Sequence, residues 1–263
     1  MLVFPQLATG VSGQFPIRKR RLARTVVNEA AGGHRVKLAD DAAAMIEWQL
    51  RFEGLTDGER DEIAQFFTAM EGRLKSFTFL DPADNLLKWS EKLDDAAWER
   101  NVLLQVTGGI GDPLGTQRAS RLSNISGATL RIEQTVNAPA WFHYAFSVWA
   151  RSDAPEQLGL VRSITGSTHV ATHDVGPGWK RLVLSGAFSD TAESLKFGLE
   201  IEAGRAVEVF GLQAEPQLGA SGYKKTVSRS GVYPQARFGD DELDVTTEAP
   251  DRHSLNLRIV SRA

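Results

Sequence analysis

Hydrophobic and polar residues alternate through the first part of the chain in a way that predicts strands. Polar residues separate the hydrophobic ones at positions 46, 48, 50 and 52, a period of two that buries one face of a strand and leaves the other in water. The same alternation returns at Phe77 and Phe79 and ends at Asp81-Pro82. These two segments are therefore interpreted as strands.

A single helix is predicted between them, over about 57–71. The tetrapeptide Thr56-Asp57-Gly58-Glu59 has the form of a capping box, in which the threonine and glutamate side chains satisfy each other's backbone N–H groups. Gly72 is suited to the position just after a helix end. Hydrophobic residues recur between them with the spacing of one helical face, at Ile63, Phe66, Phe67 and Met70.

The pattern of hydrophobic and polar residues changes at Asn85, and the earlier pattern returns near Thr226. Short alternating runs separated by turn-forming residues predict several strands and almost no helix, which is typical of a sandwich or jelly roll. The last part of the chain returns to longer alternation, for example at 255, 257 and 259. A sandwich with adjacent ends can be inserted into a loop at little cost in loop-closure entropy. We therefore expect a mainly β protein: a β-rich domain with one α-helix, formed by residues 1–84 and 227–263, that is interrupted by a β-sandwich or jelly-roll domain of residues 85–226.

Composition narrows the functional classes. The 263 residues are 42% hydrophobic and 24% charged with a net charge of −3, which argues against a disordered chain and against a bulk nucleic-acid binder. No apolar run reaches the roughly 18 residues of a membrane span, and no signal-peptide pattern follows the basic residues 18–24. The lack of cysteine excludes disulfides, thiol nucleophiles and cysteine-ligated zinc.

No catalytic motif stands out, and we expect a protein without enzymatic activity. The sequence has neither a G-x-S-x-G elbow nor a P-loop. Glycoside hydrolysis needs two acids across a cleft, and the carboxylates available for such a pair are Glu91, Asp94, Asp95, Glu200, Glu202 and Glu215. Surface carboxylates are common in any soluble protein, so a non-catalytic role is favoured for them.

His169 and His173 leave two alternatives open, a metal site and an exposed strand. On a helix this spacing would bring the imidazoles together, but the residues around them favour an extended chain, in which they lie about 13 Å apart. Val170 also stands where a zinc-protease helix requires glutamate. The strand is therefore favoured. Gly108-Gly109-Ile110-Gly111 is interpreted as a turn, because no helix follows it.

Trp149 is the best single candidate for a sugar contact. If positions 144, 146 and 148 point into the core, alternation turns Trp149 to the opposite face, together with Arg151 and His143. Exposed aromatic faces stack on the C–H groups of sugars, while nearby polar groups hold the hydroxyls. Packing of Trp149 beneath a loop or against the other domain is the alternative, and Trp179 is expected in the core.

Two charged runs suggest contacts between subunits. Arginine side chains pair well with carboxylates, so the basic run has three alternative roles: contact with an acidic neighbour, a solvated strand or arm, and nucleic-acid contact. Pairing between subunits of the basic run with the acidic run is the hypothesis kept for the site. The basic run consists of Arg18, Lys19, Arg20 and Arg21, with Arg24 nearby, and the acidic run of Asp240, Asp241, Glu242 and Asp244.

Several segments resemble bacteriophage tail-tip proteins. The strand at 48–52, the helix that ends near Phe66-Phe67, and the strand at 77–82 are similar to the arrangement in distal tail and minor tail proteins, and residues 233–241 resemble the returning part of that domain. The middle segment resembles the carbohydrate-binding-module-like jelly rolls of phage tail and fibre proteins, at its opening Asn85-Leu86-Leu87 and at its closing stretch 210–215. The resemblance extends over nearly the whole chain.

This resemblance implies a structural virion protein of the phage tail tip, made in the cytoplasm of the bacterial host. It would form a ring of six copies at the end of the tail tube, contact tube, hub or fibre proteins, and present its jelly roll to host-surface glycans. No cofactor is implied; jelly rolls of this kind often hold a structural calcium ion, but no ligand pattern for one is evident in the sequence. A stand-alone secreted or surface carbohydrate-binding protein is the alternative, and a glycan-degrading enzyme a weaker one.

Overall fold

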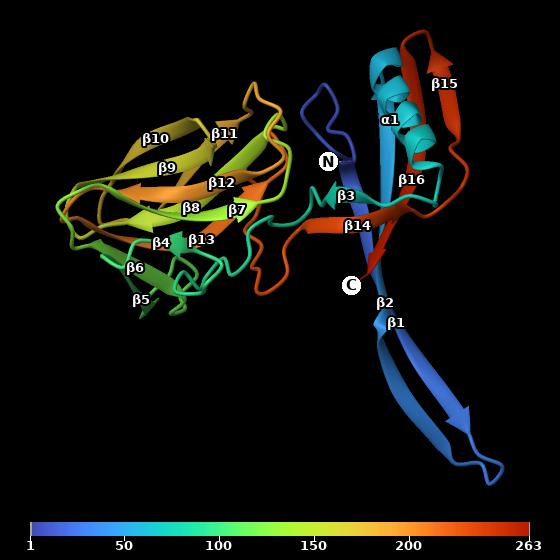
Figure 1. Cartoon of the computed structure of the whole chain (residues 1–263), viewed down its shortest axis with the longest axis horizontal. Helices are drawn as coiled ribbons and strands as arrows, with labels where there is room; N and C mark the ends of the chain where they lie inside the picture. The colour runs from blue at the N-terminus through green and yellow to red at the C-terminus, as the bar shows by residue number, and fades with distance from the viewer. Residues whose placement is uncertain (1, 263) are drawn as a thin grey trace. The chain divides into compact units, whose positions relative to one another are not determined.

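The computed structural model describes residues 2–262 and divides the chain into two compact units (Figure 1). Of the described residues, the first unit consists of 2–79 and 233–262, and the second of 80–232. Antiparallel sheets and one helix make up the regular structure of the described residues, so the prediction of a mainly β protein is confirmed. None of the helical structure in residues 2–262 is long and apolar enough to cross a membrane.

The first unit is one sheet with a helix. The strand order is β1-β2-β16-β14-β3, and β15 pairs with β16. The elements are β1 (Gln14–Glu29), β2 (Arg35–Leu55), α1 (Asp57–Met70), β3 (Phe77–Leu80), β14 (Val232–Phe238), β15 (Val245–Ala249) and β16 (Arg252–Arg262).

The inner face of this sheet carries the hydrophobic residues whose alternation predicted strand β2. Ile46, Trp48, Leu50 and Phe52 are all at most 1% exposed, and each such side chain stabilises the fold by roughly 1.5–3 kcal/mol through its burial. Aromatic rings from distant segments complete the core: Phe4, Phe66, Phe77 and Phe238 are in mutual contact. Phe79 packs against Phe4 and Trp48.

Helix α1 begins with the predicted capping box. The Glu59 backbone N–H donates to Thr56 Oγ1 (3.3 Å), and the Thr56 backbone N–H donates to Glu59 Oε2 (3.2 Å). The helix ends at Met70, and Glu71 then adopts a left-handed conformation with φ 53°. Gly72 follows with φ 58°, beside Asp241.

The second unit is a sandwich of two five-stranded sheets with orders β10-β9-β12-β7-β4 and β11-β8-β13-β6-β5. The strands are β4 (Glu99–Arg100), β5 (Leu104–Ile110), β6 (Ala119–Asn124), β7 (Leu130–Val136), β8 (Tyr144–Arg151), β9 (Glu156–Ile164), β10 (Ser167–Val175), β11 (Lys180–Gly186), β12 (Leu195–Ile201) and β13 (Ala206–Glu215). Tyr144 and Phe146 of one sheet pack against Phe197 of the other.

The two ends of the second unit are held side by side. The backbone N–H of Asp81 donates to the Gly231 carbonyl (2.8 Å), and the N–H of Gly231 donates to the Asn85 carbonyl (2.7 Å). The buried Asn85 amide adds four bonds, donating to the carbonyls of Leu212 and Lys224 and accepting from the N–H groups of Leu87 and Ala214. This network ties the entering segment to the leaving one.

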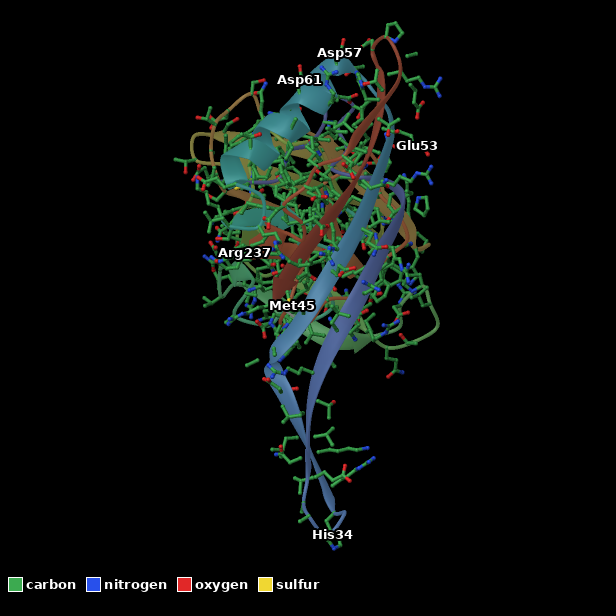
Figure 2. All side chains as sticks on the ribbon, turned by 90° about the vertical axis from the view of Figure 1, so that its right-hand side faces the viewer. His34, Met45, Glu53, Asp57, Asp61 and Arg237 are labelled. Atoms are coloured by element: carbon green, nitrogen blue, oxygen red, sulfur yellow. The ribbon has the colours of Figure 1, made fainter. Side chains whose placement is uncertain are left out.

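A hairpin arm extends from the first sheet. Strand β16 pairs with β2 from Leu55 only as far as Met45, whereas β1 continues along β2 to Arg35. Residues 23–44 therefore form a two-stranded arm, and Figure 2 shows it running from the level of Met45 to His34 at its tip. Two paired strands without a covering layer are marginally stable in water.

Candidate functional site

Two of the three predicted sugar-contact residues, Trp149 and Arg151, lie on the outer face of the sheet that contains β8. In the register of this sheet, Trp149 stands opposite Arg181 of β11 and Phe210 of β13, and Arg151 stands opposite Glu208. Residues opposite one another share a face. The buried Tyr144, Phe146 and Val148 alternate with these positions, as the sequence pattern predicted.

Trp149 is half-buried and covered. The Arg181 guanidinium carbon lies 4.4 Å from the centroid of the indole ring, and Arg181 Nη2 donates to Ser147 Oγ (3.0 Å). Tyr223 meets the indole edge-on at 6.0 Å between centroids. Tyr223 belongs to the segment that follows β13. Trp149 is therefore packed in part beneath a loop, as the alternative interpretation had it.

A second arginine–tryptophan stack lies beside the first. The Arg151 guanidinium carbon is 4.8 Å from the centroid of Trp179, and Arg151 Nε donates to Glu208 Oε2 (2.6 Å). Trp179 precedes β11 and is half-buried, so the prediction that it belongs to the core was wrong. Alternation predicts the direction of a side chain only within a strand. Trp179 precedes the first residue of β11, so the alternation of that strand does not determine where its side chain points.

His143 is not brought together with the other two candidates. It directly precedes β8, which Arg151 ends, and the six residues from His143 to Trp149 correspond to roughly 20 Å of strand. Burial and, less strongly, the positive charge of Arg162 lower the pKa of the His143 imidazole. The outer face near Trp149 and Arg151 is thus one candidate site, and His143 lies outside it.

The predicted subunit-contact residues are partly used within the chain. Arg20 pairs with Glu47 (2.5 Å), and Lys19 lies over the rings of Trp48 and Tyr233, 5.6 Å from each centroid. The acidic partners are engaged as well, Asp240 with Arg258 (2.6 Å) and Asp241 with Arg73 (2.8 Å). Among the described residues, Arg18 and Arg21 have no carboxylate within ion-pair distance.

The residues considered for a metal site or for catalysis are not grouped into such a site among the described residues. His169 and His173 lie on β10, so the strand interpretation is confirmed. Glu200 pairs with Arg131 (2.6 Å) and the buried Glu215 with Lys224 (2.7 Å). No group of three or more histidine or acidic side chains within residues 2–262 has the arrangement of a metal site.

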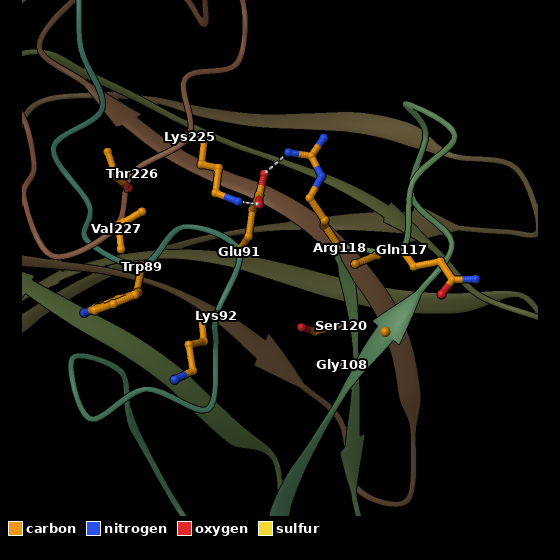
Figure 3. A pocket seen from close by; sticks show the side chains of 12 residues that line it. Trp89, Glu91, Lys92, Gly108, Gln117, Arg118, Ser120, Lys225, Thr226 and Val227 are labelled. Atoms are coloured by element: carbon orange, nitrogen blue, oxygen red, sulfur yellow. Dashed lines mark hydrogen bonds and ion pairs between the residues drawn. The ribbon is translucent and has the colours of Figure 1, made fainter.

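A pocket of about 380 Å³ near the end of β5 was not predicted from the sequence. Figure 3 shows Glu91 between Arg118 and Lys225, with N···O distances of 2.9 and 2.6 Å. Lys92 Nζ lies 5.5 Å from the centroid of Trp89, which also lines the pocket. The sequence around Trp89 does not show whether this tryptophan lines a pocket or only covers the edge of the sandwich.

The pocket is connected to the Trp149 face through Tyr223. Its hydroxyl donates to Glu91 Oε1 (3.2 Å), and its ring packs against Trp149 and against Phe210. Burial raises the pKa of the Tyr223 phenol, so this hydroxyl keeps its proton. Tyr223 therefore contacts one residue of each surface, Glu91 of the pocket and Trp149 of the outer face.

No protein-family model matches the chain, and none of the curated proteins matches it either. Similar solved structures include TmCBM61 in complex with β-1,4-galactotriose (16% identity, 49% of this chain, 97% of that chain, TM-score 0.40) and a xylan-binding domain from CBM 22 (14% identity, 53% and 98%, TM-score 0.42). Another is the enzymatically active domain of tailspike protein 4 of bacteriophage CBA120, with 15% identity, 52% of this chain, 22% of that chain and a TM-score of 0.39.

Proposed function

We propose that this chain is a structural subunit of a bacteriophage tail tip that assembles with its own copies into a closed ring and displays its sandwich for contact with host-surface glycans. In this proposal it is not an enzyme, and its partners are further copies, the tail tube and hub or fibre proteins. The observation that carries the proposal is the hairpin arm, residues 23–44.

The arm has an apolar face with nothing of its own chain upon it. Val26 stands opposite Leu38, and Val36 stands opposite Asn28, so these side chains share one face. Val36 and Leu38 are 55% and 53% exposed. Such a face on a thin hairpin is unfavourable in water, and burial against another copy would remove it from solvent.

Charge also favours another copy as the occupant. Arg18 and Arg21 lie on β1, the edge strand of its sheet, without a carboxylate partner among the described residues. Glu242 and Asp244 are exposed on the same unit, and no basic side chain of the described chain lies within ion-pair distance of them. A repeated contact between copies can pair these groups. Glu242 and Asp244 are the members of the predicted acidic run that have no partner among the described residues, whereas Asp240 and Asp241 already pair with Arg258 and Arg73.

The glycan part of the proposal is supported by the Trp149 face. It combines two half-exposed indole rings with arginine donors and with the Glu208 carboxylate. Aromatic faces and fixed polar groups of this kind suit sugar rings. A ring would multiply weak contacts of single subunits into useful avidity.

Mass photometry and negative-stain electron microscopy of the purified chain test the assembly. We expect closed rings whose mass is a whole multiple of 28.8 kDa. The double variant Val36→Ser, Leu38→Ser should dissociate them, because it removes apolar groups that are exposed in the single chain. Val102→Ser, Leu114→Ser is the matched control, since both residues are exposed and lie in the second unit. A monomeric wild-type protein that binds glycans would instead support a stand-alone carbohydrate-binding protein.

A further inference from the structure

We propose that the pocket lined by Trp89, Glu91, Lys92, Arg118 and Lys225 binds a carboxylated sugar, such as a uronic acid residue of a glycan. The inference rests on the glycan-contact part of the proposed function and assigns a ligand class and a second subsite to it. It does not depend on ring assembly.

The charge of the lining selects an anion. Three cationic side chains, those of Lys92, Arg118 and Lys225, line the pocket together with one carboxylate, that of Glu91. Outside the lining, Asp112 Oδ2 lies 3.8 Å from Arg118 Nε, so the cations still outnumber the carboxylates near them. Glu91 holds Arg118 and Lys225 by ion pairs, and its side chain is only 7% exposed. Lys92 has no carboxylate within ion-pair distance among the described residues and remains available to a ligand. A carboxylate entering the pocket would meet donors that are already oriented.

Trp89 is held in an unfavourable backbone conformation that keeps its ring in the pocket wall. Its φ is 51°, a region that bulky residues rarely adopt. Three hydrogen bonds impose this conformation: the Trp89 N–H donates to the Val227 carbonyl (2.9 Å), and the Trp89 carbonyl accepts from the Lys92 N–H (3.0 Å) and from Trp98 Nε1 (3.1 Å). Backbone strain of this kind concentrates at binding sites.

Bare backbone forms another part of the wall. The register between β5 and β6 shifts between Thr107 and Ile110, which makes Gly108 and Gly109 a bulge at the pocket. A Cβ atom added at either glycine would meet nothing within 4 Å. The bulge therefore leaves room beside the strand, as bulges next to binding sites commonly do.

These features together fit an acidic sugar better than a simple anion. The indole ring supplies a surface for the C–H face of a pyranose, and Glu91 can accept a hydrogen bond from a hydroxyl. The cations supply the counter-charge to a carboxylate. A volume of about 380 Å³ lies within the ~300–1,000 Å³ typical of small-ligand sites.

Saturation-transfer NMR titrations of the full chain test the assignment, with methyl glucuronide, methyl glucoside and sulfate as probes. We expect methyl glucuronide to bind on the order of tenfold more tightly than methyl glucoside, because a charge-assisted hydrogen bond is added. Its affinity should fall as salt is raised.

Three variants locate the site. Trp89→Gly removes the ring while suiting the positive φ, and Gly108→Phe fills the pocket from a position with ordinary φ; both should abolish saturable binding. Lys92→Gln should weaken it about five- to tenfold. Trp141→Ala, which removes an exposed tryptophan elsewhere, and Lys88→Gln are the matched controls and should bind like the wild type. Circular dichroism and thermal unfolding verify that each variant is folded.

Several results would contradict the acidic-sugar assignment, and they can be told apart from a failure of the proposed function. Equal affinity for glucuronide and glucoside, or sulfate binding that competes with glucuronide and persists in Trp89→Gly, would overturn the acidic-sugar assignment. Glucuronide binding that survives Trp89→Gly and Gly108→Phe but is lost in Trp149→Ala would also overturn it, while leaving the proposed glycan contact at Trp149 intact. If none of the three probes binds, this inference fails. The proposed ring assembly is tested independently, by the particle mass in mass photometry.

Discussion

Arg181 lies over the indole ring of Trp149, with its guanidinium carbon 4.4 Å from the ring centroid. The two residues stand directly opposite each other on β11 and β8. Burial lowers the pKa of the Arg181 guanidinium, and the nearby charge of Glu215 opposes this shift. The ring that the sequence pattern turns outward is therefore stacked against a guanidinium group.

The contribution of this stack to stability can be measured by a double-mutant cycle of Arg181→Ala and Trp149→Leu. Cation–π pairs at partly exposed sites contribute about 0.5–2 kcal/mol, and we expect a coupling energy of that size in urea unfolding. The same cycle at Arg121 and Trp149, which do not stack, should show additive effects. Additivity of the Arg181 and Trp149 changes would show that the stack contributes nothing.

Removal of Arg181 should also change glycan binding at this face. Arg181→Ala uncovers one side of the Trp149 ring, so a neutral oligosaccharide that stacks there would no longer have to displace the guanidinium. We expect tighter binding of neutral glycans in titration calorimetry, by roughly twofold to tenfold. Weaker binding would mean that Arg181 itself contacts the sugar.

Asn85→Ala should destabilise the second unit by about 2–4 kcal/mol, because the buried amide makes four hydrogen bonds whose partners would be left unsatisfied. Thermal or urea unfolding measures the loss. Asn137→Ala, at an exposed position, is the control and should change stability by less than about 0.5 kcal/mol. A similar small effect at Asn85 would contradict its role in joining the two ends of the unit.

Thr56→Ala should cost about 1 kcal/mol, since it removes one half of the capping box of helix α1. Thr56→Ser keeps a hydroxyl and should retain most of the stability. The double variant Thr56→Ala, Glu59→Ala should lose less than the sum of the single changes, because the two side chains act reciprocally. Urea unfolding monitored by circular dichroism gives these values.

Acid should destabilise the second unit partly through Asp112. Burial acts to raise the pKa of this carboxyl, but hydrogen bonds from the Thr116 hydroxyl and from the N–H groups of Arg118, Leu114 and Thr116 outweigh it and lower the pKa to about 2. The unfolded carboxyl, with a pKa near 3.8, takes up its proton first as the pH falls. Stability from this group is therefore present above pH ~4 and is lost between pH ~4 and ~2.

Asp112→Asn checks this pH dependence. The variant should be less stable at neutral pH, because an amide nitrogen in place of Oδ2 can accept from neither of the two donors that face it, the Thr116 hydroxyl and the Arg118 N–H. Its unfolding midpoint should vary less with pH than that of the wild type over the same acidic range. An unchanged pH profile would mean that Asp112 is not responsible.

Features that depend on neighbouring residues could be predicted from the sequence. The capping box of Thr56 and Glu59 lies within four residues, and the alternation around Trp48 reports its own strand. In the sandwich, alternation likewise predicted the outward direction of Trp149.

Features that depend on distant partners could not be predicted in this way. The cover over Trp149 comes from Arg181 on another strand and from Tyr223 beyond β13. The positive φ of Trp89 is imposed partly by a bond to Val227, and the arm owes its length to β16 ending its pairing at Met45. Local pattern carries no information on such pairings.

The adjacent ends of the second unit have a mechanical consequence. A pull transmitted along the backbone of the first unit enters at Asp81 and leaves at Gly231, which are already joined by a backbone hydrogen bond. Tension would therefore load this junction and the bonds of Asn85 before any strand of the two sheets. The strands of the sandwich would carry no load until this junction opens, so the second unit would keep its fold while the chain on either side of it is under tension.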